Sequence, residues 1–386
     1  MKKGQVQKEG GFSLYLQHLH LINYRNYKNQ ELNLNRGINV LIGANGQGKT
    51  NLLEAIYYLS MGGNFRGNKD VELICWEQPY FRLLGQMKKD DSARCYDLEI
   101  YVDREKNKQL KINGVKYKSM AELHNYLRVV LFSPDDLKII KGSPAERRRY
   151  LDVVMCQMDK GYHRLMRDYE RVVQQRNNLL KELQYRQQNR NQLEVWNSYL
   201  IEYGSQIIYR RIQFLKLLVP AARRVQQALT QQMERFTVTY HCSMGAIGDF
   251  TLEQIKDLFR RILEQKQGEE ILRGTTLWGP HRDDLIFYLN GMDLRRYGSQ
   301  GQQRTGILAL KMAELQTFYR CYGEYPLLLL DDVMSELDDS RRHFLLEMVK
   351  KNEIQTIITG ANIELLTEEI ARDDVFSVKE GKIIRK

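Results

Sequence analysis

A phosphate-binding loop near the amino end of the chain constrains its fold more than any other feature. Residues 43–50 match the pattern G-x-x-x-x-G-K-[ST]. A strand-like run, residues 38–42, precedes the loop, and a stretch with helical apolar spacing, residues 51–59, follows it. This order predicts a P-loop within an α/β fold. Its residues are Gly43, Ala44, Asn45, Gly46, Gln47, Gly48, Lys49 and Thr50.

The chemistry of this loop predicts ATP and Mg²⁺ as ligands. Glycines let the backbone wrap closely around an anion. The N–H groups of the loop and of the following helix then face the phosphates. We expect Lys49 to reach the β- and γ-phosphates and to support catalysis, and the Thr50 hydroxyl to bind Mg²⁺.

Two adjacent carboxylates, Asp331 and Asp332, follow a run of four leucines at residues 327–330. P-loop proteins complete the Mg²⁺ shell with an acid at the end of a buried strand. We therefore predict that Asp331 binds Mg²⁺, directly or through water. Asp332 is placed to orient or deprotonate the attacking water.

A second candidate anion site lies far along the chain, just before a helix predicted over residues 305–319. It contains Ser299, Gly301 and Gln302. A Ser and a Gly at a helix start can bind an anion. Because this segment is so distant from the P-loop in sequence, it need not serve the nucleotide held by the same molecule. A further segment of the type S-x-L-D ends at Asp338.

Most of the net charge of +11 is concentrated in one region. Residues 144–235 contain 17 Lys and Arg against 9 Asp and Glu, a net charge of +8. Such a segment attracts phosphate backbones, so we predict DNA contacts at Arg147, Arg148 and Arg149. A basic helix surface, with partners such as Asp152, is the alternative interpretation.

The same region predicts a helical hairpin. Apolar residues recur at helical spacing over residues 165–183 and 193–218, and the polar residues 185–192 separate the two stretches. Arms of this kind would be about 40 Å long. Pro220 is expected to end or kink the second arm.

Composition excludes several classes of protein. No apolar run approaches the roughly 18 residues of a membrane span. The five cysteines are odd in number and lack metal-site spacing, which is typical of a reducing cytoplasm. We therefore expect a cytoplasmic protein without a membrane partner.

The order of P-loop, S-x-G-Q, hhhhDD and S-x-L-D resembles that of ABC-type ATPases of chromosome maintenance and recombination repair. Within this group, four further segments are similar to the RecF family: residues 19–27, 132–137, 141–152 and 279–285. The resemblance implies an ATPase head built from both chain ends with an inserted helical domain. The expected divisions are a loose tail at 1–13, head residues 14–143, the insertion at 144–274, and head residues 275–386.

The resemblance also implies a function. Two subunits would sandwich two ATP molecules, with Ser299, Gly301 and Gln302 of one subunit reaching the nucleotide of the other. Asp338 would also bind nucleotide. The homodimer would bind duplex and gapped DNA in recombinational repair and replication restart. RecR, with RecO, would be its partners, and RecA would be loaded indirectly. Thr359 stands where related ATPases carry a switch histidine, consistent with slow, weak DNA-dependent hydrolysis.

One departure leaves the role of Arg66 open: residues 64–67 read Asn-Phe-Arg-Gly where the family carries a Ser/His-x-Arg-like segment. The alternative function is that of an ABC-type ATPase subunit of another DNA-maintenance or transport complex. The long basic insertion argues against a transporter subunit. Arms of about 30 residues argue against a chromosome organiser with long coiled coils.

Overall fold

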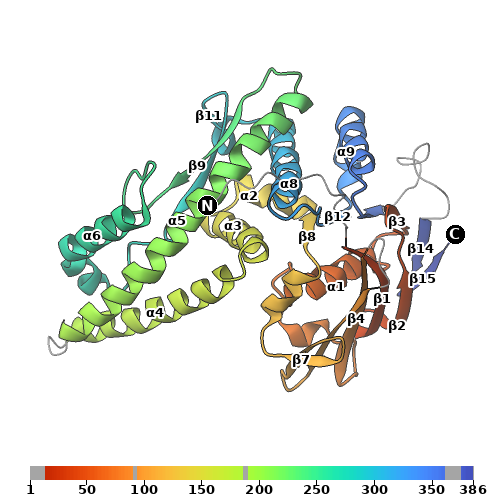
Figure 1. The fold of residues 1–386 in the computed structure, drawn as a ribbon, viewed down its shortest axis with the longest axis horizontal. Helices are drawn as coiled ribbons and strands as arrows, with labels where there is room; N and C mark the ends of the chain where they lie inside the picture. Colours follow the sequence, from red (N-terminus) through yellow and green to blue (C-terminus); the bar gives the residue numbers. More distant parts are fainter. Residues whose placement is uncertain (1–13, 90–93, 186–189, 361–374, 386) are drawn as a thin grey trace. The chain divides into compact units, whose positions relative to one another are not determined.

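The computed structural model describes residues 14–89, 94–185, 190–360 and 375–385 (Figure 1). They form two compact units, Met1–Asp136 with Glu314–Lys386, and Leu137–Ala313. The predicted tail, residues 1–13, lies outside the described residues, as do residues 186–189 of the predicted polar turn. The bounds of these units differ from those of the expected ATPase head and inserted domain. The division into a head and an insertion therefore stays a prediction.

A six-stranded sheet in the first unit combines strands from both ends of the chain. Neighbouring strands are parallel except for the last hairpin. The buried runs of leucine, isoleucine and valine explain this arrangement, because parallel strands are covered on both faces. In spatial order the strands are β15 (Lys382–Arg385), β14 (Val375–Lys379), β3 (Ile38–Ile42), β13 (Thr356–Gly360), β12 (Leu327–Asp331) and β8 (Val129–Phe132).

A second, antiparallel sheet of the first unit has one buried face. Its strands alternate between buried and accessible residues, as in Tyr80–Lys89. The strand-like runs at residues 14–21, 96–102 and 109–112 of the sequence all lie within strands of this sheet. The spatial order is β2 (Tyr27–Asn33), β1 (Leu14–Tyr24), β4 (Tyr80–Lys89), β5 (Cys95–Asp103), β6 (Lys108–Ile112) and β7 (Val115–Tyr117).

Helix α1 (Lys49–Met61) packs against strands of both sheets. Nine consecutive residues, Leu52 to Ser60, are buried, so the helix is enclosed on all sides. One apolar cluster joins this helix to both sheets. The loop before α1 is thereby fixed at the carboxyl edge of the parallel sheet. The remaining elements of the first unit are α9 (Asp339–Lys351) and the short 3₁₀ helices η1 (Asp70–Leu73), η2 (Met120–Asn125), η3 (Pro134–Asp136) and η4 (Val333–Ser335).

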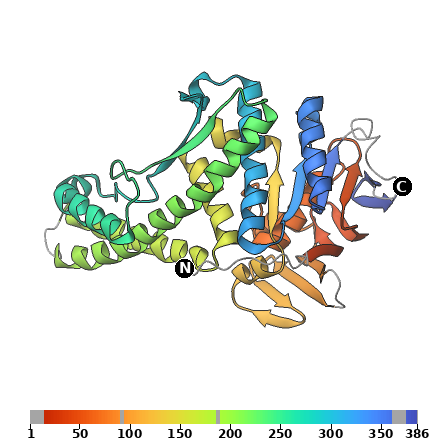
Figure 2. The same cartoon turned by 45° about the horizontal axis from the view of Figure 1, so that its top comes forward.

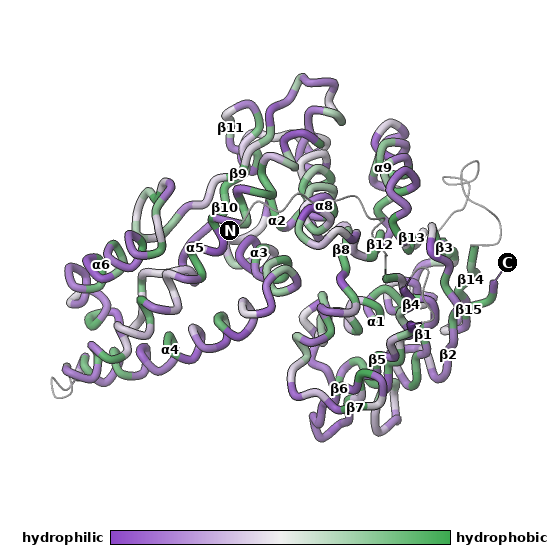
Figure 3. Tube along the Cα trace, in the orientation of Figure 1, coloured by the Kyte–Doolittle hydropathy of each residue, from purple (hydrophilic) through white to green (hydrophobic). Residues whose placement is uncertain are grey.

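The predicted helical hairpin is confirmed in the second unit. Helices α4 (Tyr162–Leu183) and α5 (Arg190–Leu229) lie side by side in Figures 1 and 2. Hydrophilic and hydrophobic residues alternate along α4 in Figure 3. Pro220 does not end α5, which continues for nine residues to Leu229. The burial of Ala221, Ala222 and Val225 stabilises the helix beyond the proline.

Other elements of this unit also extend beyond their predicted bounds. The helical stretch that the sequence indicates at residues 252–266 continues to Arg273, because Glu270 is buried and pairs with Arg176. The helix expected from Thr305 begins at Gln300. The strand-like runs at residues 236–240 and 285–289 of the sequence each lie within a strand. The elements are α2 (Leu137–Lys141), α3 (Pro144–Met158), β9 (Phe236–His241), α6 (Leu252–Arg273), β10 (Asp284–Leu289), β11 (Met292–Asp293) and α7 (Leu294–Tyr297), with a sheet of order β11-β10-β9. Helix α8 (Gln300–Tyr322) begins in this unit, and its residues from Glu314 belong to the first unit.

Candidate nucleotide-binding site

The loop between β3 and α1 requires glycine at several positions. Gly46 and Gly48 have φ angles of 81° and 117°, in the left-handed region that other residues rarely adopt. A Cβ atom on Gly43 would lie 2.3 Å from the Val378 carbonyl oxygen of β14. The glycines of the motif therefore serve the close packing of the loop as well as its curvature.

Two turns far away in sequence hold the loop in place. Asn26 Nδ2, between β1 and β2, donates to the Gln47 carbonyl oxygen over 3.0 Å. The Tyr27 hydroxyl donates to the Gly48 carbonyl oxygen over 2.9 Å. On the other side, the Glu380 N–H donates to Gln47 Oε1 over 2.6 Å. Sequence reasoning missed these contacts, because no local pattern signals partners so distant along the chain.

Lys49 lies across this loop. Its side chain is 7% exposed. Its Nζ donates to the carbonyl oxygens of Gly43 and Ala44 over 2.6 and 3.0 Å. The Lys49 ammonium group is thus held by backbone carbonyl groups of the loop. Its three rotatable N–H donors can exchange these carbonyl contacts for phosphate oxygens.

The predicted pair of Mg²⁺ ligands is brought together across 281 residues. Thr50 Oγ1 donates to Asp331 Oδ1 over 3.0 Å. Thr359 Oγ1 donates to the same oxygen over 2.9 Å. Burial raises the pKa of Asp331, and the hydrogen bonds from Thr359 and Thr50 counteract that rise in part. A hydroxyl and a carboxylate in contact fit the oxygen ligands that Mg²⁺ takes from proteins.

Asp332 has a backbone geometry set by the same threonine. Its N–H donates to Thr359 Oγ1 over 3.0 Å, and its φ of 57° is left-handed. Such a conformation persists only where surrounding contacts impose it. The residue standing in place of a switch histidine, Thr359, therefore holds the carboxylate of Asp331 and the backbone of Asp332.

Arg66, whose role the sequence left open, lies near this site. Its Nη1 donates to Asn51 Oδ1 in the first turn of α1, over 3.3 Å. Its positive charge is among the causes that hold the pKa of Asp331 down against burial. This electrostatic effect on Asp331 links Arg66 to the site, and it depends on the folded structure rather than on any local sequence pattern.

The second predicted anion site forms a capping box at the start of α8. The Gln302 N–H donates to Ser299 Oγ over 3.2 Å, and the Ser299 N–H donates to Gln302 Oε1 over 3.0 Å. Ser299 and Gly301 are exposed, and a Cβ on Gly301 would have open space except for the Ser299 hydroxyl at 4.0 Å. This half-site belongs to the second unit and the P-loop to the first.

Asp338 caps helix α9. Its Oδ1 accepts from the Arg341 N–H over 3.0 Å and from the Ser340 hydroxyl over 2.8 Å. The first of these bonds is the main reason that its pKa lies below the ordinary value. The side chain is exposed, so a nucleotide contact remains a prediction.

The three arginines predicted to contact DNA have different environments. Arg147 is 3% exposed, and its guanidinium makes a two-point contact with Asp284 at 2.6 and 2.8 Å. Arg148 is half-buried and donates to the Asp283 carbonyl oxygen over 2.8 Å. Only Arg149 is exposed. Arg147 is therefore removed from the set of candidate DNA contacts, because tertiary pairing occupies its charge.

His281 and Asp283 make hydrogen bonds that connect distant elements of the second unit. His281 Nδ1 pairs with the Tyr169 hydroxyl at 2.7 Å. Asp283 accepts from the Tyr240 hydroxyl over 2.5 Å and from the Ser243 N–H over 2.7 Å. These bonds connect α4, β9 and the turn before β10, which is a structural role.

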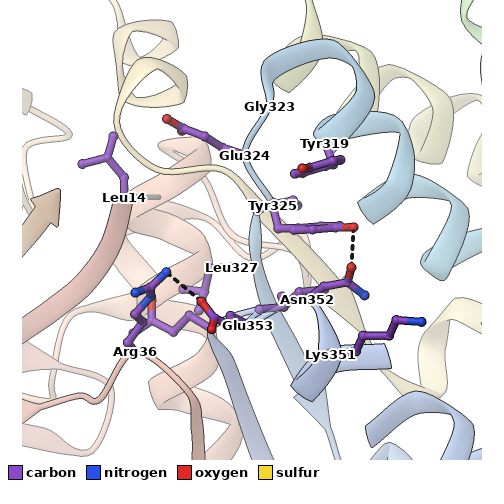
Figure 4. Close-up of a pocket in the computed structure, with 13 residues that line it drawn as sticks. Leu14, Arg36, Tyr319, Gly323, Glu324, Tyr325, Leu327, Lys351, Asn352 and Glu353 are labelled. Atoms are coloured by element: carbon purple, nitrogen blue, oxygen red, sulfur yellow. Dashed lines mark hydrogen bonds and ion pairs between the residues drawn. The ribbon is translucent and has the colours of Figure 1, made fainter. Parts of the chain in front are cut away.

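A separate pocket of about 290 Å³ lies at the opposite edge of the parallel sheet (Figure 4). Most of its lining residues precede β12 or β13, whereas the P-loop follows β3. Tyr319 and Tyr325 stack at 4.5 Å, the Tyr325 hydroxyl donates to Asn352 over 3.1 Å, and Arg36 pairs with Glu353. The pocket is thus no part of the nucleotide site.

Two absences hold within the described ranges. No helix there is long and apolar enough to cross a membrane. No cluster of three or more His, Cys, Asp or Glu side chains suited to a metal ion occurs among those residues. The Thr50 and Asp331 pair differs from such a cluster, because it offers one hydroxyl and one carboxylate and leaves the other positions around Mg²⁺ to phosphate oxygens and water.

Comparison with known proteins connects this geometry to one family. The profile of the family described as "RecF/RecN/SMC N terminal domain" matches residues 15–384. A "DNA replication and repair protein RecF" from Halothermothrix orenii is 42% identical over 375 residues, 96% of this chain and 99% of the relative. The protein of the same name from Bacillus pumilus is 39% identical over 373 residues, 96% of this chain and all of the relative.

Solved structures give the same result. One described as "Structure of the recombination mediator protein RecF-ATP in RecFOR pathway" superimposes with a TM-score of 0.90 at 34% identity, covering 98% of this chain and all of that one. An Smc head domain from Pyrococcus furiosus, at 16% identity and a TM-score of 0.54, shares the fold alone. The predicted ABC-type ATPase fold is therefore confirmed, and this chain belongs to the RecF family.

Proposed function

We propose that this chain is an ATP-dependent DNA-binding protein of recombinational repair and replication restart, acting in the cytoplasm. The observation that carries the proposal is the hydrogen bond between Thr50 and Asp331 beside a glycine-rich loop that holds Lys49. ATP would bind with its phosphates in this loop.

Different residues would bind the phosphates, hold Mg²⁺ and orient the attacking water. The backbone N–H groups of residues 43–50 would surround the phosphates, and Lys49 would exchange its two carbonyl contacts for the β- and γ-phosphates. Thr50 and Asp331 would hold Mg²⁺, which when bound supplies positive charge against the phosphate oxygens. Asp332 would orient the attacking water.

Ser299, Gly301 and Gln302 would contact the γ-phosphate held by a second copy of the chain. The capping box supports this role, because its serine hydroxyl is exposed and linked to the helix N–H groups. ATP would then assemble the homodimer, with Asp338 at the same nucleotide. Duplex or gapped DNA, RecR with RecO, and indirectly RecA are the partners that family membership supports.

Ser299→Arg tests the assembly. The long charged side chain should block ATP-dependent dimerisation and leave ATP binding by the monomer unchanged. Light scattering with a non-hydrolysable ATP analogue measures the first property, and equilibrium nucleotide binding measures the second. A dimer of wild-type affinity from this variant would refute the sandwich.

Co-sedimentation with duplex DNA, with and without ATP, tests the wider function. We expect binding to rise with ATP. A chain that binds ATP and ignores DNA under both conditions would exclude the proposed repair role and favour another ABC-type ATPase complex.

A further inference from the structure

One face of helix α4 carries mainly arginine and amide side chains. The other exposed residues of the helix, His163, Glu170, Lys181 and Glu182, lie at the edge of this face or near the helix ends. The opposite face is buried by residues such as Leu165, Tyr169 and Val172. At 100° per residue, the exposed arginine and amide side chains fall within about 120° of the helix circumference. Its members, called the α4 stripe below, are Arg164, Arg167, Arg171, Gln174, Gln175 and Asn178.

The three arginines of the stripe make only long, exposed ion pairs within the protein. Their side chains are 81%, 51% and 68% exposed and surround a single carboxylate, Asp168. The three nitrogen-to-oxygen distances are 3.8, 3.6 and 3.9 Å, too long for hydrogen bonds. One negative charge is shared by three positive charges, so a net positive charge faces solvent. Arg147, fully paired and buried, contrasts with this arrangement.

The chemistry of the stripe selects a class of ligand. It contains no apolar or aromatic residue, whereas protein partners are held by buried aromatic and aliphatic anchors. Arginine guanidinium and glutamine or asparagine amide groups are the donors that bind phosphate oxygens of nucleic acids. From Arg164 to Asn178 the stripe rises about 21 Å, at 1.5 Å per residue. That length presents donors to several successive phosphates.

We propose that the α4 stripe binds the phosphate backbone of duplex DNA. This inference rests on the proposed DNA-binding function and names the surface that performs it. The arginines neutralise phosphates and release counterions, and the neutral amides donate hydrogen bonds without releasing them. Binding at this surface is independent of base sequence, because phosphate contacts position a protein without reading bases.

The test compares two triple substitutions in the full-length protein with the same change in net charge. The first is Arg164→Ala, Arg167→Ala and Arg171→Ala in the α4 stripe. The matched control is Arg260→Ala, Arg261→Ala and Arg273→Ala, which removes three exposed arginines of α6 in the same unit. Fluorescence anisotropy measures the affinity for labelled duplex DNA over a range of salt concentrations, with ATP present.

We expect the α4 variant to lose more than roughly tenfold in affinity and to flatten the log–log salt slope by about 2 to 3. In the α6 control, the salt slope should change by less than about a third of the change seen in the α4 variant, since only long-range charge is altered. Gln174→Ala with Gln175→Ala should lower affinity at an unchanged slope. Both arginine variants should retain wild-type ATP binding and thermal stability.

Each other outcome has a distinct meaning. Equal losses in the two triple variants would reduce the effect to net charge and overturn the assignment to α4. An α4 variant with wild-type affinity and slope would overturn it directly. Loss of binding to a partner protein but not to DNA would assign the stripe to that protein instead. A wild-type protein that binds no DNA would remove the proposed function itself.

Discussion

Gln302 Nε2 donates a hydrogen bond of 2.9 Å to Glu234 Oε1. The other oxygen of Glu234 accepts from Nε2 of Gln226, which is fully buried near the end of α5. The start of α8, with its exposed serine, is therefore tied to the long arm helix through one carboxylate.

Glu234→Ala should weaken ATP-dependent dimerisation without changing ATP binding by the monomer. The substitution removes the acceptor that holds the Gln302 side chain of the capping box. It also leaves the buried Gln226 amide without this acceptor, which costs about 1–3 kcal/mol of stability. Light scattering and urea unfolding measure the two effects. Glu234→Gln, which retains one acceptor, should be intermediate; equal behaviour of both variants and wild type would contradict the coupling.

Lys49→Met should abolish tight ATP binding. The residue is the cation held within the loop by carbonyl contacts at 2.6 and 3.0 Å, and methionine keeps its length without the charge. Lys49→Arg should bind ATP and barely hydrolyse it, because a planar guanidinium places its donors differently. Equilibrium binding and phosphate release separate the two variants, and wild-type affinity in the methionine variant would remove the P-loop assignment.

Asp332→Asn should retain ATP binding and lose hydrolysis, which prolongs the dimer. A neutral amide is a poorer base than a carboxylate. The backbone contact to Thr359 does not involve the side chain, so the loop should keep its geometry. Hydrolysis at the wild-type rate would show that the roles of Asp331 and Asp332 have been divided incorrectly.

The His281 imidazole predicts a dependence of stability on pH. Burial, as the largest cause, lowers its pKa from 6.5 to about 4. The folded protein therefore favours the neutral ring, and its contribution is complete above pH 6.5 and is lost as pH falls towards 4. The difference corresponds to roughly 3 kcal/mol at most.

Urea unfolding at pH 7 and pH 4.5 measures this contribution. Buried Asp283 acts in the opposite direction, since its pKa is raised by burial and its protonated form is favoured on folding. His281→Asn isolates the histidine, and the loss of stability between the two pH values should be smaller in this variant. An unchanged difference would mean that folding does not lower the pKa of His281.

The sequence alone determined the elements whose signals are local. The P-loop, the strand before Asp331 and the two arms of the hairpin each follow from a pattern of neighbouring residues. The contact between Thr50 and Asp331 could also be predicted, because the chemistry of phosphate binding requires both groups at one site. The helix bounds were less accurate: packing carries α5 past Pro220 and begins α8 at Gln300.

Tertiary structure decided which of the chemically similar side chains are available to a ligand. Arg147 and Arg164 are both arginines of a basic helical segment, yet one is buried against Asp284 and the other is 81% exposed. The contact of Gln47 with Glu380 and the bond from Gln302 to Glu234 join residues with no periodic relation. Periodicity specifies which face of a helix is buried, but the partner of a charged or polar group depends on which distant segment packs there.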